Sequence, residues 1–386
     1  MNLKRLLPLA ARAAAVAPIA LSLLAALARP ARSADAPAAT GQWSIERWSE
    51  SAGTVQLSLI LGSPNHRHES SSNAVALAKL TGLTAEDMRR DAVDVMFRLQ
   101  RDAGAIVMQG TLAHGSGRGT FDLFLAPTFA DELEHRGVGR PTPAQQLKLV
   151  FNDGRLALLD ELHDQGYPAP NVDMFVRCTQ HGVSPEYVHA MVALGYKLAS
   201  LDEWVKARDH GVDPEFVDGM SKAGYAKLTF AQLLRARDHG ADPEYAAAMR
   251  AAGFGDRSLD DLVTTRDHGV DAEFIRALDA LGFGGLSLAK LVELRDHGVD
   301  AQYLAGLRQA GFANVTPSAA LEARIHGVDA AYIVSLQEAG YPSLTLPEAI
   351  RARDHGVDAG FASDATRRLG RTPSLDELIR MRDTGQ

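Results

Sequence analysis

Residues 208–216 read Arg-Asp-His-Gly-Val-Asp-Pro-Glu-Phe, and the His-Gly pair at their centre recurs every 29 residues. The pairs begin at His181, His210, His239, His268, His297, His326 and His355. A strict period between 20 and 50 residues is typical of stacked repeats, because a single repeat cannot bury its apolar face without its neighbours. Residues 126–386 therefore predict an αα-solenoid of about nine 29-residue helix-turn-helix repeats.

Each repeat contains the signals of two short helices. Asp213 suits an N-cap, Pro214 suits the first helical position, and Gly224 suits the left-handed residue that ends a helix. The other helix is expected from about Leu201 to His210, whose imidazole can bond the orphan carbonyls of the last turn. The expected structural caps are His210, Gly211, Asp213, His239, Gly240, Asp242, His268, Gly269, Asp271, His297, Gly298 and Asp300.

Seven histidines in register also raise the alternatives of metal binding and catalysis. Helices in contact lie about 8–10 Å apart, whereas a zinc ion needs four ligands at about 2.0–2.3 Å. One histidine per layer, with no cysteine or second histidine beside it, does not complete such a set. The preferred interpretation is capping and hydrogen bonding between repeats, with no metal and no other cofactor.

An Arg-Asp pair precedes the histidine just as regularly, except that Ile325 replaces one aspartate. Adjacent residues on a helix do not face each other, but an arginine of one repeat can reach the aspartate of the next. The pattern predicts an inter-repeat ladder of ion pairs, with a solvated stripe or an arginine row that grips an acidic partner as alternatives. The ladder residues are Arg208, Asp209, Arg237, Asp238, Arg266, Asp267, Arg295 and Asp296.

One position of each repeat changes its charge along the chain. Solenoids present extended binding surfaces on which variable positions carry specificity. A row that changes sign suits a specific partner better than a simple polyanion. The candidate partner-binding face is Lys206, Arg235, Thr264, Glu293, Glu322, Arg351 and Arg380.

The N-terminus has the features of a secretory leader. Lys4 and Arg5 precede an uncharged run of 16 residues, 13–28, which ends in an Ala-x-Ala-like cleavage site. Residues 1–28 are therefore predicted to be a signal peptide, and 29–41 a Pro- and Ala-rich linker. An uncleaved anchor is the alternative. No other stretch is long and apolar enough to span a membrane, so we expect an exported protein, periplasmic or extracellular.

Between the linker and the repeats, the apolar period changes to two. Val55, Leu57, Leu59 and Leu61 alternate with polar residues, and the same alternation returns three times before residue 125. Such alternation predicts half-buried strands. Residues 42–125 are expected to form a small antiparallel β domain of five or six strands, which makes the fold class α+β, mainly α.

Few signals of catalysis occur. HExxH, GxSxG and phosphate-loop motifs are absent from the sequence. His66 and His68 occupy a polar stretch that predicts a surface loop, with a weak metal or ligand site as the alternative. The only cysteine, Cys178, excludes an intrachain disulfide and is expected to be a packed helical thiol rather than a reactive one. The net charge of −8 argues against nucleic-acid binding.

The tandem units of the form HGV(D/S/T)PE(F/Y)…GY resemble repeats of bacterial exported proteins. They are also similar to segments that lie C-terminal to BlaR-type membrane metallopeptidases. The stretches 43–47 and 97–104 resemble the β-rich segment that accompanies those repeats. The peptidase part, with its metal motif and membrane helices, is absent here, so no catalytic residue carries over. The resemblance implies a sensing or interaction module that exists without the enzyme.

These observations favour a non-catalytic scaffold or sensor that binds another envelope protein or a peptide. The first alternative is an envelope hydrolase, or a regulator of a metallopeptidase, with a site in the β domain that uses the His66/His68 loop. The second is a purely structural spacer. A pull-down from envelope extracts separates the spacer from the binding module, and a metal assay separates the hydrolase.

Overall fold

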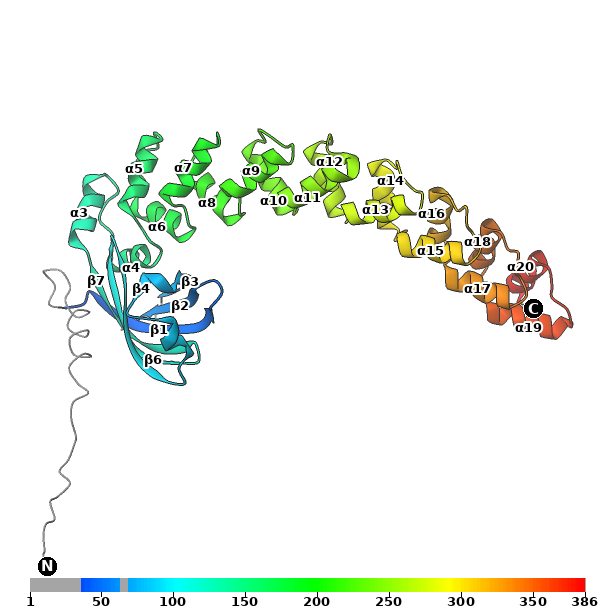
Figure 1. Cartoon of the computed structure of the whole chain (residues 1–386), viewed down its shortest axis with the longest axis horizontal. Helices are drawn as coiled ribbons and strands as arrows, with labels where there is room; N and C mark the ends of the chain where they lie inside the picture. Colours follow the sequence, from blue (N-terminus) through cyan, green and yellow to red (C-terminus); the bar gives the residue numbers. More distant parts are fainter. Residues whose placement is uncertain (1–35, 63–68, 386) are drawn as a thin grey trace, which may run out of the picture. The chain divides into compact units, whose positions relative to one another are not determined.

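The computed structural model describes residues 36–62 and 69–385. The chain divides between Asp209 and His210 into two compact units. An antiparallel sheet comes first along the chain, and helices follow it, so the fold is α+β and mainly α (Figure 1). The signal peptide predicted at 1–28, the first part of the predicted linker and the His66/His68 stretch lie outside the described residues.

Among the described residues the sheet has seven strands in the order β3-β2-β1-β7-β6-β5-β4, and each strand pairs antiparallel with its neighbours. The alternating segments predicted from the sequence lie on β2, β5, β6 and β7, and the strand number exceeds the five or six expected. Between β3 and β5 come the short η1 (Leu77–Lys79) and α2 (Ala85–Arg89). The strands are β1 (Ala39–Ser49), β2 (Thr54–Leu61), β3 (Glu69–Ala76), β4 (Leu80–Thr81), β5 (Val93–Arg101), β6 (Gly104–Ala113) and β7 (Ser116–Leu125).

Trp43 lies at the centre of the core of the sheet. Its side chain is 2% exposed, and its ring meets that of Phe97 edge-on with centroids 5.0 Å apart. The indole Nε1 donates to the carbonyl of Gln109 at 3.1 Å. A Cβ at Gly119 would lie 2.7 Å from that Nε1, so only glycine lets the backbone of β7 pass beneath the indole.

The first compact unit joins the sheet to the helices that directly follow it. The helix α4 contacts β5, β6 and β7. Its Gln146 is buried and donates to the carbonyls of Ala103 at 2.7 Å and Ala126 at 3.2 Å. Both carbonyls also accept a backbone N–H, Ala103 from Ala126 and Ala126 from Phe129, each at 3.1 Å, so Gln146 adds a second donor to each. The helices of this unit are α3 (Pro127–His135), α4 (Pro143–Phe151), α5 (Leu156–Asp164), α6 (Val172–Gln180), α7 (Pro185–Ala193) and α8 (Leu201–Asp209).

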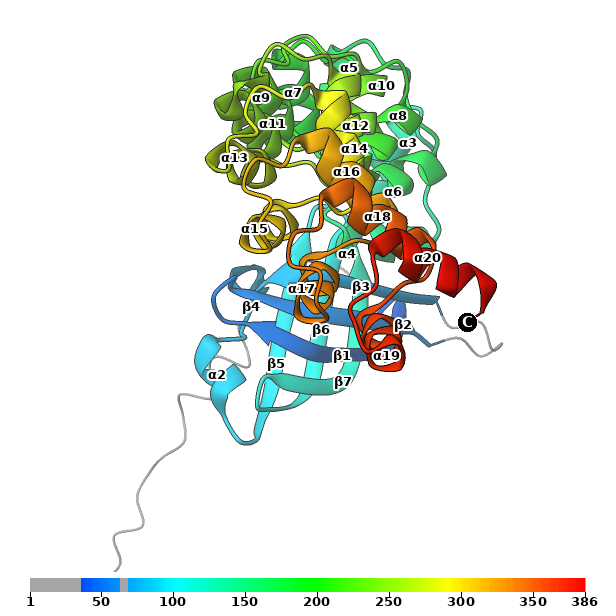
Figure 2. The same ribbon diagram turned by 90° about the vertical axis from the view of Figure 1, so that its right-hand side faces the viewer.

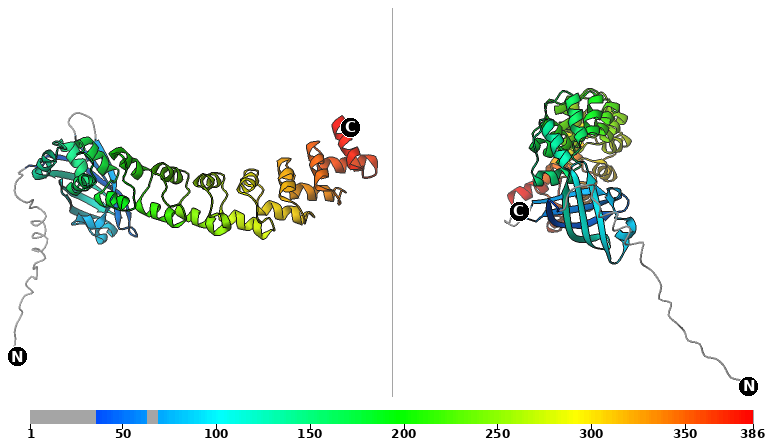
Figure 3. Two further views of the ribbon diagram at one scale, coloured as in Figure 1. Left: turned by 90° about the horizontal axis from the view of Figure 1, so that it is seen from above. Right: turned by 90° about the vertical axis from the view of Figure 1, so that its left-hand side faces the viewer.

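The second compact unit is a repeat-like series of short helices in two rows. Figure 2 shows α9, α11, α13 and α15 on one side and α10, α12, α14 and α16 on the other, and the two rows are also visible from above in Figure 3. Most of these helices pack on the helix two places further along the chain, as in α9 on α11 and α10 on α12. Apolar stripes spaced three and four residues apart provide these contacts.

Helix bounds in this unit are α9 (Pro214–Lys222), α10 (Phe230–Asp238), α11 (Pro243–Met249), η2 (Arg250–Phe254), α12 (Leu259–Asp267), α13 (Ala272–Ala280), α14 (Leu288–Asp296), α15 (Ala301–Gln309), α16 (Pro317–Ile325), α17 (Ala330–Glu338), α18 (Leu346–Asp354), α19 (Ala359–Leu369) and α20 (Leu375–Thr384). None of the helices within 36–62 and 69–385 has the length and apolar content to cross a bilayer.

Candidate functional site

The aspartate that follows each His-Gly pair caps the next helix. The carboxylate of Asp213 accepts from the backbone N–H of Phe216 at 2.8 Å, and Pro214 follows at the first helical position. The same 2.8 Å bond occurs at Asp242, Asp271 and Asp300. These four residues therefore satisfy orphan backbone donors.

The histidine of the pair lies one residue beyond the helix. Helix α10 ends at Asp238, and His239 is the C-cap, with φ −92° and ψ 3°. Gly240 follows with φ +66°, in the left-handed region that favours glycine. The expectation that the helix includes the histidine is thus wrong by one residue, because the glycine ends the helical hydrogen bonding at the residue before it.

The histidine ring faces a carboxylate rather than the helix-end carbonyls that we expected. Nδ1 of His239 lies 2.8 Å from Oδ1 of Asp267, which is 28 residues further along. A carboxylate only accepts, so the imidazole donates. The same pair joins His181–Asp209, His210–Asp238, His268–Asp296, His326–Asp354 and His355–Asp383.

The arginine before each aspartate lies over an aromatic ring of the preceding repeat. The guanidinium carbon of Arg266 is 4.8 Å from the ring centroid of Tyr245, and that of Arg295 is 4.9 Å from the ring of Phe274. Arg208, Arg237, Arg324, Arg353 and Arg382 make the equivalent contact with Tyr187, Phe216, Tyr303, Tyr332 and Phe361. A cation over a ring face is attracted by the ring's quadrupole.

These contacts correct the predicted Arg-Asp ladder. No ion pair found among the described residues joins an arginine of that row to an aspartate of that row. The arginine extends back over the aromatic ring and the left-handed glycine, where a Cβ on Gly211 would lie 3.1 Å from Nε of Arg237. The aspartate is then left to face the histidine. Most junctions between repeats thus carry a His-Asp pair and an Arg-aromatic pair in place of the expected Arg-Asp pair.

One step of this row lacks the carboxylate. Ile325 occupies the place where an aspartate would face His297, and its side chain is 56% exposed. Isoleucine offers His297 no carboxylate. Of the two contacts that join the other repeats, this junction therefore keeps only the one between Arg324 and Tyr303. Isolated exposed apolar residues are ordinary, so Ile325 by itself marks no binding site.

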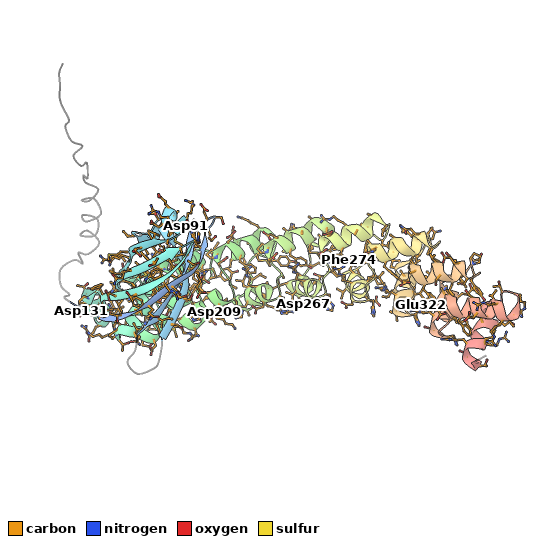
Figure 4. The ribbon with its side chains drawn as sticks, turned by 90° about the horizontal axis from the view of Figure 1, so that it is seen from below. Asp91, Asp131, Asp209, Asp267, Phe274 and Glu322 are labelled. Carbon is orange, nitrogen blue, oxygen red and sulfur yellow. The ribbon has the colours of Figure 1, made fainter. Side chains whose placement is uncertain are left out.

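The variable positions chosen from the sequence are all exposed, near the C-terminal ends of the even-numbered helices. Glu322 on α16 is one of them, and Figure 4 labels it together with Asp267 on α12 and Phe274 on α13. Some members of this set form pairs, either with the next repeat or within their own helix. Arg235 pairs with Asp260, Arg351 pairs with Asp376, Lys290 Nζ lies 2.8 Å from Glu293, and Arg380 donates to the Asp376 carbonyl at 3.1 Å.

Metal-binding clusters are not found in the part of the chain that the structure describes. No group there of three or more histidine, cysteine or acidic side chains could hold a metal ion. Cys178 is buried, and burial raises the pKa of its thiol to about 12, far from thiolate chemistry at neutral pH. His66 and His68 lie outside the described residues, so the loop expected there stays a prediction.

Sequence reasoning missed a further set of side chains that cap carbonyls across junctions. Arg250, Arg308 and Gln337 reach back 27 residues to the carbonyls of Ala223, Leu281 and Ala310. The signal was available, because these residues share one position of the 29-residue period. That position also varies in chemistry, which hid it from a search for constant residues. No protein-family model matches the chain, and no curated protein matches it.

Proposed function

We propose that the chain is a non-catalytic binding module of the bacterial cell envelope that recognises a protein or a peptide. In this proposal the helices form an αα-solenoid of about nine 29-residue repeats behind a small β domain, and residues 1–28 direct export. The helix-on-second-helix contacts of α9 to α20 support the solenoid, because each repeat packs mainly on its neighbours.

One observation carries the binding role. The constant residues of the period contact neighbouring repeats, as in His239 with Asp267 and Arg266 with Tyr245. The variable position is exposed throughout. Selection for stacking accounts for the constant residues and for Arg235 and Arg351, which pair with Asp260 and Asp376 of the next repeat. It gives no reason for Glu293 and Glu322, for which no ion pair with another repeat is found in the described part of the chain. Surface complementarity to one partner does, since patterned charge favours one partner and register over others.

The test is a pull-down from envelope extracts with charge reversal on the row. A Glu293→Arg/Glu322→Arg variant is expected to lose a protein that the wild-type chain retains. Glu338→Arg is the matched control, because Glu338 on α17 is also exposed but lies off this row. Loss of the same protein in both variants, or retention in both, would reject the row as the binding face. A chain that retains nothing specific would favour the structural spacer.

A further inference from the structure

A pocket of about 280 Å³ opens beside the end of α11 and the turn η2, against α13 and the start of α14. Figure 1 labels α11, α13 and α14. Phe254, Arg257, Asp279 and Phe283 are among its lining residues. It lies at a junction between successive odd-numbered helices, where helix-end carbonyls have no partner within their own helix.

Equivalent junctions of the same compact unit show what normally occupies this place. Arg250 donates to the carbonyl of Ala223 at 3.5 Å. Arg308 donates to the carbonyl of Leu281, and its guanidinium carbon lies 5.3 Å from the ring centroid of Phe283. In each case the guanidinium comes from the residue 27 positions after the carbonyl. At a third junction the amide of Gln337 donates to the Ala310 carbonyl at 2.9 Å. The chain therefore fills these junctions with a planar N–H donor, and twice that donor is a guanidinium.

At the pocket the chain does not supply that group. The residue 27 positions after Ala252 is Asp279, and a carboxylate cannot donate to a carbonyl. No side chain of the described residues is found donating to the Ala252 carbonyl. Phe254 stands 29 residues before Phe283, the ring that receives Arg308. The carbonyl, the ring and the space are thus present without a guanidinium from position 279, where a carboxylate stands instead. The guanidinium near the ring comes from Arg257.

We propose that this pocket takes the guanidinium of an arginine side chain from a partner protein. A planar guanidinium can donate to the Ala252 carbonyl and the Asp279 carboxylate while it stacks on Phe254, which an ammonium cannot match. Arg257 already lies 5.8 Å from the centroid of that ring. The carboxylate of Asp279 offsets the second positive charge, and Arg257 weakens the site by repulsion.

The inference rests on the proposed function only in taking the partner to be a protein. The pocket itself is tested on the full-length chain with N-acetyl-L-argininamide, followed by NMR at the amides of residues 252–254 and 279. N-acetyl-L-citrullinamide, which has nearly the same shape but no charge, is the control probe. We expect saturable shifts with the arginine compound at millimolar concentration and none with the citrulline compound.

Variants sharpen the test. Asp279→Arg is expected to refill the pocket from within, as Arg308 does, and to abolish the shifts. Asp279→Asn keeps the shape and should weaken binding about two- to fivefold, the range for an exposed ion pair. Arg257→Ala should strengthen binding, whereas Glu338→Gln should leave it unchanged. Because Asp279 is exposed, these variants should fold, and the amide spectrum of each checks this.

Equal shifts with the citrulline compound, or shifts that persist in Asp279→Arg, would overturn the proposal that the pocket binds a guanidinium. This failure is separate from failure of the proposed function. Suppose that the envelope pull-down captures a partner through the Glu293/Glu322 row while the arginine compound does not bind. The proposed binding module is then supported, and the guanidinium pocket is rejected. If the compound binds as expected while no partner is captured, the guanidinium pocket is supported and the proposed envelope partner is rejected.

Discussion

The imidazole of His239 lies 2.8 Å from the carboxylate of Asp267, the residue one place short of a full sequence repeat away. The two side chains are 42% and 43% exposed. The recurring His-Gly motif resembles a metal-binding or catalytic signature, but in this pair its histidine joins two neighbouring repeats. Asp267 faces the histidine of the preceding repeat, while Arg266 beside it stacks on Tyr245 of that repeat.

Breaking the pair between His239 and Asp267 should have a small, measurable cost. His239→Ala and Asp267→Asn, combined in a double-mutant cycle of urea unfolding, are expected to give a coupling energy of roughly 0.2–1 kcal/mol, the range for exposed ion pairs. His297 provides the control, since Ile325 stands where its partner would be. A cycle of His297→Ala with Ile325→Ala should show no coupling, and a coupling as large as that of His239 would contradict the assignment.

The His-Asp pair that is missing at His297 should be restorable by substitution of Ile325. Ile325→Asp is expected to raise the free energy of unfolding by a few tenths of a kcal/mol, because it offers His297 a carboxylate and removes an exposed apolar side chain. Ile325→Asn is the matched control for shape and polarity without charge. The gain should disappear in a His297→Ala background and shrink at high salt. A gain equal for aspartate and asparagine would mean that relief of apolar exposure alone is responsible.

The left-handed glycine should resist substitution for two separable reasons. Gly211→Ala is expected to be destabilised by the backbone term, about 1–2 kcal/mol, and also by contact with Arg237, since the added Cβ would lie 3.1 Å from Nε. Gly282 also has positive φ, at +79°, but nothing lies within 4 Å of an added Cβ. Gly282→Ala should therefore show the backbone term alone. Equal losses in thermal unfolding would exclude a packing role for the arginine.

Alkaline pH should loosen the junction between α17 and the turn before α19. The hydroxyl of Tyr332 donates to the carbonyl of Val357 at 2.7 Å, and burial raises the pKa of Tyr332 to about 12. In the unfolded chain the phenol loses its proton near pH 10. Between pH 10 and 12 the folded state therefore holds the extra proton, so the free energy of unfolding falls as pH rises.

Tyr332→Phe tests this directly. At pH 7 it should cost about 1–3 kcal/mol, because the buried Val357 carbonyl loses its donor. Between pH 10 and 12 its stability should fall less steeply than that of the wild-type chain. Phe361→Tyr adds a phenol at the equivalent position of the next repeat and serves as the comparison. An unchanged alkaline slope in Tyr332→Phe would show that this phenol does not titrate with folding.

Much of the local structure could be predicted. Proline after Asp213 and glycine at 211 and 224 are strong start and stop signals, since they act through the backbone of their own segment. The alternation at Val55, Leu57 and Leu59 likewise indicated a strand with one buried face. The helix at Leu201 was expected to include His210, yet it ends at Asp209. The side-chain partners were harder, because an arginine can reach either a carboxylate or a ring within a similar radius.

The amino-acid order by itself determined the 29-residue period, the change from strands to helices near residue 125 and the caps of the helices. All of these depend on interactions within a few residues. Only the tertiary structure decided that Arg266 stacks on Tyr245, that Asp267 meets His239, and that the place filled by Arg308 is empty beside Asp279. Those outcomes depend on how one repeat is turned against the next, and packing of many side chains at once sets that angle.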